Sequence, residues 1–348
     1  MIKLIGVIGG IKCVSTAYNV KIDAEINGEY RLTFDVTPRE STWSDLNEGA
    51  LLECEGQKYR VYSANEENGG AAKKSLDCVH VITDASLTHL PRFPILSGGV
   101  EFWANAHPRD IMVEAFRGTD FVVLRTDQAP WITDTTDFWV VDKTNPLEVV
   151  NKLLEQFPYA EMYVDNYNIA LVMRLGFATR ERLDMRKNLM RINRSKDIDD
   201  VITRLYAYGR DGLSLASPGY VASPFLLRYG CVRDGFRTFD WIDGLNPDIT
   251  LLEAAQAMFS EDNPNRIDVP KVTYTIEYID LMKAGIGVFV PRLGDSVVIV
   301  DSVLGIEETQ RIRKYEYYPY SPERSRIELG KSKTTLKDHI KKIIRMER

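Results

Sequence analysis

The chain is poor in the residues on which thiol and metal chemistry depend. Its 348 residues contain 4 cysteines and 4 histidines. Cys13, Cys54, Cys78 and Cys231 show no paired metal-ligand spacing, and they are too few to form a disulfide framework in a chain of this length. We therefore expect reduced thiols that pack in the core or lie near the surface.

The sequence also lacks export and membrane signals. Residues 1–14 are apolar, but Gly6, Gly9 and Gly10 interrupt them, and neither a charged lead nor a small-residue cleavage site is present. No apolar run approaches the roughly 18 uninterrupted residues of a membrane-spanning helix. These absences predict a protein that is made and folds in a cytosol and does not insert into a membrane.

Acidic and basic residues are nearly balanced in number. Lysine and arginine number 44 against 50 aspartates and glutamates, for a formal net charge of −6. This balance argues against a general nucleic-acid binder, and we expect no sequence-specific contact with nucleic acid. Two stretches, 174–196 and 331–348, are nevertheless basic. Such runs are typical of solvated faces, and a surface for a partner is the alternative.

The histidines do not have the spacing of a zinc site. A zinc peptidase needs two or three convergent ligands, usually a helical turn apart or alternating on a strand. His80, His89, His107 and His339 lie in four unrelated contexts, and none forms His-Glu-x-x-His or His-x-His. The sequence therefore predicts no metal site, and each histidine is expected at the surface or at the edge of a core.

No nucleophile is placed for catalysis either. Cys54 and Cys78 lie in strand patterns, where a side chain packs, rather than at a helix N-terminus. Gly294-Asp295-Ser296 superficially matches the start of a serine esterase motif, but among the histidines only His339 follows it. A turn that leads into a strand explains these three residues more simply.

Neighbouring carboxylates do not form a catalytic pair. Glu66-Glu67, Asp199-Asp200 and Glu307-Glu308 are adjacent in sequence, and neighbours on a strand point to opposite faces. Residues 165–168 hold an aspartate and two asparagines, but they lack the spacing and the closing glutamate of a calcium loop, so a tight hairpin turn is expected. We predict no catalytic residue, no cofactor and no metal.

Alternating strands dominate the first 95 residues. Apolar and polar residues alternate along 20–26 and 30–36 on either side of Asn27-Gly28, which predicts a β-hairpin with a two-residue type I′ turn. Further strands are expected at 51–54, 57–63 and 75–82. Several short strands without a clear helix favour a first β-barrel domain over 1–95.

Helices and strands mix in residues 96–190. Pro108 suits the first turn of a helix that buries Ile111, Met112, Ala115 and Phe116. Asn145-Pro146 is typical of an N-cap and first helical position, followed by an apolar face of Leu147, Val150, Leu154 and Phe157. Strands are expected at 121–125, 138–141, 161–164 and 169–172. The pattern predicts an α+β domain.

The rest of the chain reads as an interrupted second barrel. We assign its strands to 191–211 and 271–330, including strand runs at 297–300 and 303–306. The intervening 212–270 is predicted to be a small inserted α+β domain with a helix at 249–259 capped by Asp248. Residues 331–348 are predicted to form a basic amphipathic C-terminal helix. The predicted fold is thus α+β and mostly β, with two small β-barrels, an α+β domain between them and an insertion in the second barrel.

Three short motifs carry a family resemblance. They are Thr-Arg-Leu-Tyr-x-Tyr-Gly at 203–209, Leu-Gly-Asp-x-Val at 293–297 and Ile-Glu-Leu-Gly at 327–330. With this order, residues 188–330 resemble the prophage tail-associated lysins, also labelled prophage endopeptidase tail proteins. In that family the first motif precedes an insertion and the other two follow it.

The resemblance implies a structural phage or prophage tail protein, a baseplate hub or tail-tip subunit that joins the sixfold tail tube to the threefold tip. It implies a homotrimer in the virion tail, assembled in the host bacterial cytoplasm. The implied partners are the tail tube or distal tail protein and the tape-measure or tail-tip proteins. In long family members a cell-wall hydrolase follows this region, so this chain is expected not to be an enzyme. The alternative is a cell-wall hydrolase of the endopeptidase type with an unrecognised active site.

Overall fold

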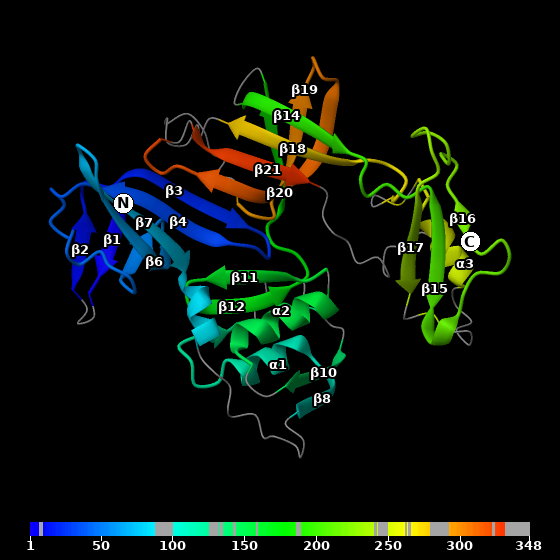
Figure 1. The fold of residues 1–348 in the computed structure, drawn as a ribbon, viewed down its shortest axis with the longest axis horizontal. Coiled ribbons are helices and arrows are strands. Elements are labelled where there is room, and N and C mark those ends of the chain that lie inside the picture. The colour runs from blue at the N-terminus through cyan, green and yellow to red at the C-terminus, as the bar shows by residue number, and fades with distance from the viewer. Residues whose placement is uncertain are drawn as a thin grey trace. The chain divides into compact units, whose positions relative to one another are not determined.

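The computed structural model describes residues 1–6, 10–87, 100–124, 132, 135–141, 144–157, 159–185, 189–239, 242, 250–261, 263, 266–278, 292–321 and 324–330. These residues divide between two compact units (Figure 1). Met1–Asn193 and Thr275–Gly330 form the larger unit, and Arg194–Tyr274 belong to the smaller one.

A 13-stranded sheet is the main feature of the fold, and its path runs β14-β18-β21-β20-β3-β4-β7-β6-β5-β1-β2, with β13 and β19 off this path. Its N-terminal strands are β1 (Ile2–Ile5), β2 (Ile11–Val14), β3 (Tyr18–Glu25), β4 (Tyr30–Val36), β5 (Leu51–Cys54), β6 (Gln57–Asn68) and β7 (Ala72–His80). Its other strands are β13 (Ala178–Asp184), β14 (Leu189–Asp197), β18 (Lys271–Tyr278), β19 (Ser296–Asp301), β20 (Ile306–Tyr317) and β21 (Arg326–Gly330).

Strand β20 joins the two groups of strands in this sheet. Its first half pairs with β19, and its second half pairs with β3, from Lys314 opposite Glu25 to Tyr317 opposite Ile22. The prediction of two small barrels is therefore not confirmed, because the paired strands that the structure describes close no barrel. One 12-residue strand supplies hydrogen bonds to both groups, and alternation in the sequence cannot reveal such shared pairing.

The hairpin predicted over 20–36 is confirmed, but its turn differs from the prediction. Strands β3 and β4 pair antiparallel, with Ala24 opposite Tyr30. Asn27 has a φ of 56°, and the amide of Gly28 donates to the carbonyl of Glu25 at 3.1 Å. Gly28 itself is not at positive φ. A type I′ turn needs positive φ at both central residues, so that assignment was wrong.

Alternation along β3, β4 and β7 places one face of each strand in the core of the N-terminal part. Strand β5 matches its predicted range, while β6 extends beyond 57–63 and β7 begins before 75. The buried residues of this core are Ile2, Leu4, Val14, Val20, Ile22, Leu32, Phe34, Val36, Leu46, Leu52, Cys54, Tyr59, Val61, Leu76 and Cys78.

An α+β region follows strand β7. It contains a 3₁₀ turn η1 (Val81–Leu87), β8 (Val100–Ala106), α1 (Pro108–Ala115), β9 (Val122–Val123), β10 (Thr136–Val141), α2 (Pro146–Gln156), β11 (Glu161–Asp165) and β12 (Asn168–Val172). The predicted N-cap is confirmed, because the side chain of Asn145 accepts a hydrogen bond from the amide of Glu148. Helix α2 buries Val149, Val150 and Leu153, so its apolar face is rotated by about one position from the predicted one.

The smaller unit contains a sheet of three strands, β15 (Arg204–Gly209), β16 (Val221–Ala222) and β17 (Asp234–Phe239), after which comes helix α3 (Leu251–Ala257). Strand β15, which the sequence placed with 271–330, pairs instead with β16 and β17, which follow it in the chain. A short 3₁₀ turn, η2 (Arg210–Gly212), ends it. Helix α3 is capped by Thr250 in a capping box with Glu253. The cap proposed at Asp248 lies outside the described residues.

The loop between β19 and β20 corrects another expectation. Residues 302–305 form a turn, and Val303 in it is 91% exposed, so of the strand predicted over 303–306 only Ile306, the first residue of β20, is in a strand. The carboxylate of Asp301 accepts from the amides of Val303 and Leu304, which favours the turn. The predicted C-terminal helix, 331–348, lies outside the described residues. None of the helices in the described part of the chain is long and apolar enough to cross a membrane.

Candidate functional site

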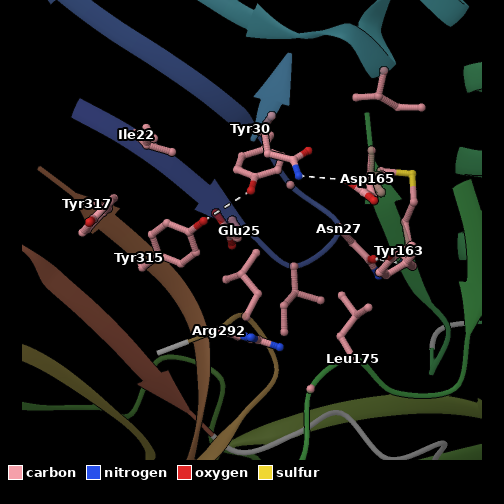
Figure 2. A pocket seen from close by; sticks show the side chains of 18 of the residues that line it. Ile22, Glu25, Asn27, Tyr30, Tyr163, Asp165, Leu175, Arg292, Tyr315 and Tyr317 are labelled. Atoms are coloured by element: carbon pink, nitrogen blue, oxygen red, sulfur yellow. Dashed lines mark hydrogen bonds between the residues drawn. The ribbon is translucent and has the colours of Figure 1, made fainter. Parts of the chain in front are cut away.

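A cavity of about 660 Å³ lies in the larger unit, where the β3–β4 hairpin, the β5–β6 turn, the β11–β12 hairpin, residues 175–177 and 292–293, and β20 meet (Figure 2). We call this region the junction. The polar or aromatic side chains that line the cavity are Glu25, Asn27, Tyr30, Glu55, Gln57, Tyr59, Tyr163, Asp165, Phe177, Arg292, Tyr315 and Tyr317. The volume is in the range of about 300–1,000 Å³ that is usual for small-molecule sites.

Asn27 joins the tip of the β3–β4 hairpin to the α+β region. Its side-chain amide donates to the carbonyl of Ala160 at 2.8 Å, and its side-chain oxygen accepts from the amide of Met162 at 2.7 Å. Asn27, a residue typical of tight turns, therefore also forms hydrogen bonds with two backbone groups of another part of the chain. This contact holds one wall of the cavity against the other.

The β5–β6 turn meets the β11–β12 hairpin through side-chain amides. Asn166, with a φ of 54°, accepts from the amide of Lys58 at 2.8 Å and donates to the carbonyl of Gly56 at 3.0 Å. Gln57 donates to a carboxylate oxygen of Asp165 at 3.0 Å. The tight hairpin turn predicted at 165–168 is confirmed, since Asp165 pairs with Asn168.

A buried ion pair crosses the junction. Arg311 on β20 contacts both carboxylate oxygens of Glu161 on β11, and the two side chains are 4% and 10% exposed. Arg311 also donates to the carbonyls of Gly294 and Leu175, at 2.8 and 2.7 Å, and Glu161 accepts from the amide of Leu175 at 2.6 Å. Hydrogen bonds to the remaining donors and acceptors are what a buried pair requires to offset its desolvation.

Two glycines allow the backbone at this pair to come together. Gly176 and Gly294 have φ values of +68° and +88°. A Cβ on Gly176 would lie 2.2 Å from the carbonyl carbon of Gly294, and one on Gly294 would lie 2.3 Å from the carbonyl oxygen of Leu175. The glycine of the Leu-Gly-Asp motif therefore serves backbone contact and left-handed conformation. No esterase turn is needed to explain it.

His80 is buried beside the cavity in its neutral form. Its ring stacks on Tyr30 with centroids 5.0 Å apart, its Nδ1 accepts from the amide of Ile82, and its Nε2 is 3.1 Å from the side-chain oxygen of Gln57. Burial lowers the pKa of His80 to about 4, although the charge of Asp165 acts in the opposite direction. The prediction that this histidine lies at the surface or at the edge of a core is wrong, because the residue is fully buried.

Tyrosines form the inner wall of the cavity. The hydroxyls of Tyr30 and Tyr315 are 3.3 Å apart, and burial raises the pKa of Tyr30. The hydroxyl of Tyr59 is buried and has no hydrogen-bond partner among the residues that the structure describes. An unsatisfied buried hydroxyl costs about 1–3 kcal/mol. The cavity therefore contains a polar group that the chain itself leaves unsatisfied.

The other residues weighed in the sequence are not brought together. Cys54 and Cys78 are buried, Cys13 and Cys231 are exposed, and none of these four forms a disulfide. Burial raises the pKa of Cys78, which makes it a poor nucleophile. Ser296 begins β19, and its hydroxyl accepts from Arg174 at 2.6 Å.

The remaining histidines and carboxylate pairs are scattered. His107 is the N-cap residue of α1, and His89 and His339 lie outside the described residues. Glu66 and Glu67 pair with Lys74 and Lys73. Glu307 pairs with Arg182, and Asp199-Asp200 form part of a turn. Within the described ranges, no group of three or more histidine, cysteine or carboxylate side chains could hold a metal ion.

Sequence reasoning missed the junction because its parts are far apart in the chain. Arg311 and Glu161 are separated by 150 positions, and Asn27 and Met162 by 135. The turn signals at Asn27 and Asn166 were visible in the sequence, but nothing in a turn signal says that the side chain also bonds to a distant strand. The glycines at 176 and 294 were the other available signal, as positions of close backbone approach.

Comparison with known proteins identifies the chain's relatives. The family model described as prophage endopeptidase tail matches residues 178–340, and the one described as its N-terminal domain matches residues 8–80. No curated protein matches the sequence.

Solved structures share the fold at low sequence identity. The prophage tail protein gp18 of Listeria monocytogenes is 14% identical with a TM-score of 0.62, and the match covers 99% of each chain. The 43 kDa tail protein of prophage MuSo2 from Shewanella oneidensis is 12% identical with a TM-score of 0.64, over 97% of this chain and 98% of that one.

A more distant structure extends the comparison to secretion systems. An E. coli component of the type VI secretion system, described as similar to the bacteriophage T4 tail proteins gp27 and gp5, is 7% identical with a TM-score of 0.50, over 97% of this chain and 78% of that one. The two family matches together span both groups of strands in the large sheet, and the fold is that of solved prophage tail proteins. The chain belongs to the prophage endopeptidase tail family.

Proposed function

We propose that the protein is a baseplate hub or tail-tip subunit, which joins the sixfold tail tube to the threefold tip of a phage tail. The observation that carries the proposal is the fold likeness to the Listeria prophage tail protein over 99% of both chains. The described resemblance of the type VI component to two T4 tail proteins supports a position at the tip. The protein would reside in the virion tail after assembly in the cytoplasm of the host.

The adaptor mechanism needs a homotrimer in which each subunit offers two similar β-rich parts. Three subunits would then present six such parts to the tube. The candidates are the N-terminal strands β1–β7, within the tube-docking region 1–95, and the strands of 271–330. Strand β20 supports this proposal, because its pairing with β3 fixes the two parts in one sheet. A rigid spacing between them is what a six-to-three match requires.

Sheet edges supply a means of contact with neighbouring chains. Strand β2 ends the sheet path, and Ile11 on it is 64% exposed. An edge strand with exposed apolar residues pairs readily with another chain. We propose that such edges are covered in the assembled tail, by other subunits, by the tube or distal tail protein, or by tape-measure or tip proteins. The formal net charge of −6 suits a channel that does not retain passing DNA.

Particle imaging and solution mass test the adaptor together. We expect a trimer, in solution or on addition of the tube protein, whose six β-rich parts lie at equal radius around one axis. Electron microscopy of the tail tip decides this point. Parts at clearly unequal radii, or a stable assembly that is not threefold, would refute the adaptor mechanism.

We further propose that this chain does not itself hydrolyse cell walls. The thiols, the histidines and Ser296 have the scattered positions described above, whereas the family description contains the word endopeptidase. A cell-wall hydrolase is therefore the alternative function. Zymography on bacterial cell walls separates the two. Clearing that survives repurification and disappears in a point variant of this chain would establish the hydrolase.

A further inference from the structure

The cavity at the junction is lined by three carboxylates, Glu25, Glu55 and Asp165, against one basic side chain, Arg292. Glu25 and Asp165 both line it, and neither forms an ion pair with a lysine or arginine among the described residues. Asp165 accepts hydrogen bonds from Gln57 and Asn166, which are neutral. Glu55, also at the wall, pairs with the N-terminal ammonium at 3.7 Å. Two carboxylates therefore line the space without a salt-bridge partner in the described part of the chain, and Arg292 is the one basic side chain in the lining.

Aromatic side chains surround these carboxylates. Figure 2 shows Tyr30 and Tyr315 bonded through their hydroxyls on one wall, with Tyr163 and Asp165 across the space from Tyr315. The faces of tyrosine rings attract cations within about 6 Å, and more strongly where water is excluded. An anion would meet two uncompensated carboxylates in the same space. The carboxylates and tyrosine rings that line the cavity therefore favour a positively charged ligand over an anion.

The unsatisfied hydroxyl of Tyr59 is an independent sign of a missing occupant. The side chain is 0% exposed and lines the same cavity, yet its hydroxyl has no partner in the described part of the protein. Buried polar atoms in native proteins are almost always satisfied by protein, water or ligand. A polar occupant of the cavity, or water that such an occupant holds in place, would supply the partner.

We propose that the junction cavity binds an organic cation, a primary ammonium or guanidinium group on a short apolar stem. The charged group would lie between Glu25, Asp165 and the tyrosines, and the stem would contact Ile22, Met162 and Leu175. Arg292 also lines the cavity, and in the view of Figure 2 it lies below Glu25, on the side away from Tyr30 and Asp165. Such a group reaches the site either as a free amine or as a lysine or arginine side chain of another chain.

Calorimetric titration of the full chain with n-butylammonium chloride and n-butylguanidinium chloride tests the proposal. We expect saturable binding of at least one of these cations that weakens as salt is added, because the attraction is between partly exposed charges. n-Butanol and sodium butyrate have the same stem without the positive charge and should not bind. Binding of butanol or butyrate as tight as that of the cations, or no saturable binding of either cation, would overturn the proposal.

Matched variants locate the binding. Glu25→Gln and Asp165→Asn keep the size of each side chain and should each weaken cation binding about tenfold, the loss of about 1.4 kcal/mol of attraction. Glu29→Gln is the control, because Glu29 lies on the same hairpin, does not line the cavity and has a side chain 78% exposed. Unfolding midpoints equal to that of the unaltered protein show that each variant is folded. Equal weakening in Glu29→Gln, or none in the two cavity variants, would exclude this site.

Two further ligands distinguish the sources of the cation. 1,5-Diaminopentane represents a free amine, and lysine blocked as its N-acetyl methylamide represents a side chain of another chain. Tighter binding of the diamine assigns the site to a free amine, and tighter binding of the blocked lysine assigns it to a partner protein. Binding of neither, at concentrations where n-butylammonium saturates the site, would contradict both sources and overturn the proposal as a physiological site.

Discussion

Two arginine–carboxylate pairs, one in each compact unit, have the same chemistry but differ in solvent exposure, in the sequence separation of the partners and in the groups that surround them. Arg311 and Glu161 in the larger unit are 4% and 10% exposed and connect elements 150 positions apart. Arg204 and Asp234 in the smaller unit are 30% and 49% exposed and lie opposite each other on β15 and β17. The first pair is enclosed by backbone carbonyls, whereas the second lies beside the rings of Tyr206 and Tyr220.

The difference shows that a buried ion pair constrains the fold, whereas an exposed ion pair contributes little to stability. A buried charge without its partner is strongly unfavourable, so the Arg311–Glu161 pair permits one arrangement of β20 against β11. An exposed pair is screened by water and salt and contributes little to stability. Near Arg204, Tyr208 and Phe236 are 45% and 71% exposed, so that face of the small sheet remains open to solvent in this chain.

Removal of Arg311 is the strongest test of this comparison. We expect Arg311→Met to lower the free energy of unfolding by about 3–5 kcal/mol, because Glu161 would remain charged and buried. Denaturant unfolding measures the loss, and hydrogen exchange should increase in β11 and at residues 174–177. The double variant Arg311→Met/Glu161→Leu should recover part of the loss. A loss below about 1 kcal/mol in the single variant would mean that the pair is solvated.

A second test uses pH and His80. The folded pKa of His80 is about 4, because burial disfavours the charged ring, against about 6.5 when unfolded. Between these values the unfolded state binds a proton that the folded state does not, so stability falls as pH is lowered from 6.5 to 4. We expect a loss of about 2–3 kcal/mol over this window. His80→Asn should remove the slope, whatever its effect on stability at pH 7.

The pH window identifies the group responsible. Hydrogen bonds from Thr16 and Thr42 outweigh the effect of burial on Glu40 and hold its pKa at about 2. Its stabilising contribution is therefore lost below the ordinary glutamate range, at a lower pH than that of His80. An unchanged slope between pH 6.5 and 4 in His80→Asn would show that other groups cause it and that His80 is accessible to protons.

A third and smaller effect should separate turn geometry from the contacts across the junction. Asn27→Ala should cost about 1–2 kcal/mol, since the carbonyl of Ala160 and the amide of Met162 lose their partner. Asn19→Ala is the control. Asn19 has a similar φ of 53°, but its side-chain amide donates to Asp35 at the surface and makes no contact across the junction among the described residues. Equal losses would mean that backbone conformation alone matters. Faster exchange of the Met162 amide is expected in Asn27→Ala alone.

Local signals in the sequence predicted local structure well. Asn145-Pro146 marked the start of α2, and strand β5 was placed at its exact bounds, because capping and alternation depend on neighbouring residues. Asn27-Gly28 correctly predicts the position of a turn, but the type I′ geometry that this dipeptide predicts is wrong. The β-branched side chain of Val303 predicts a strand, whereas the hydrogen bonds that Asp301 accepts stabilise a turn there.

Pairing between distant segments could not be predicted in the same way. Alternation along 306–317 is the same whether the strand pairs with β19, with β3 or with both, and the structure shows both. Strand β15 likewise has the pattern of any half-buried strand. Nothing in its own sequence shows that it pairs with β17 and not with the strands of 271–330. The cavity could not be predicted for the same reason, since seven separate segments of the chain contribute to its wall.

The smallest expected effect concerns the exposed pair. Arg204 donates to the carboxylate of Asp234, and this hydrogen bond lowers the pKa of Asp234, yet both side chains are in contact with water. We expect Arg204→Met to leave the denaturant midpoint unchanged within replicate scatter, since an exposed pair gains little over two solvated charges. Hydrogen exchange in β15 and β17 reports on the smaller unit without interference from the larger one.

Leu205, which neighbours Arg204 but is buried, is the matched control, and Leu205→Ala should destabilise this unit by about 2–5 kcal/mol. A loss for Arg204→Met that approaches that of Leu205→Ala would break the comparison, because an exposed pair would then be as important for the fold as the core.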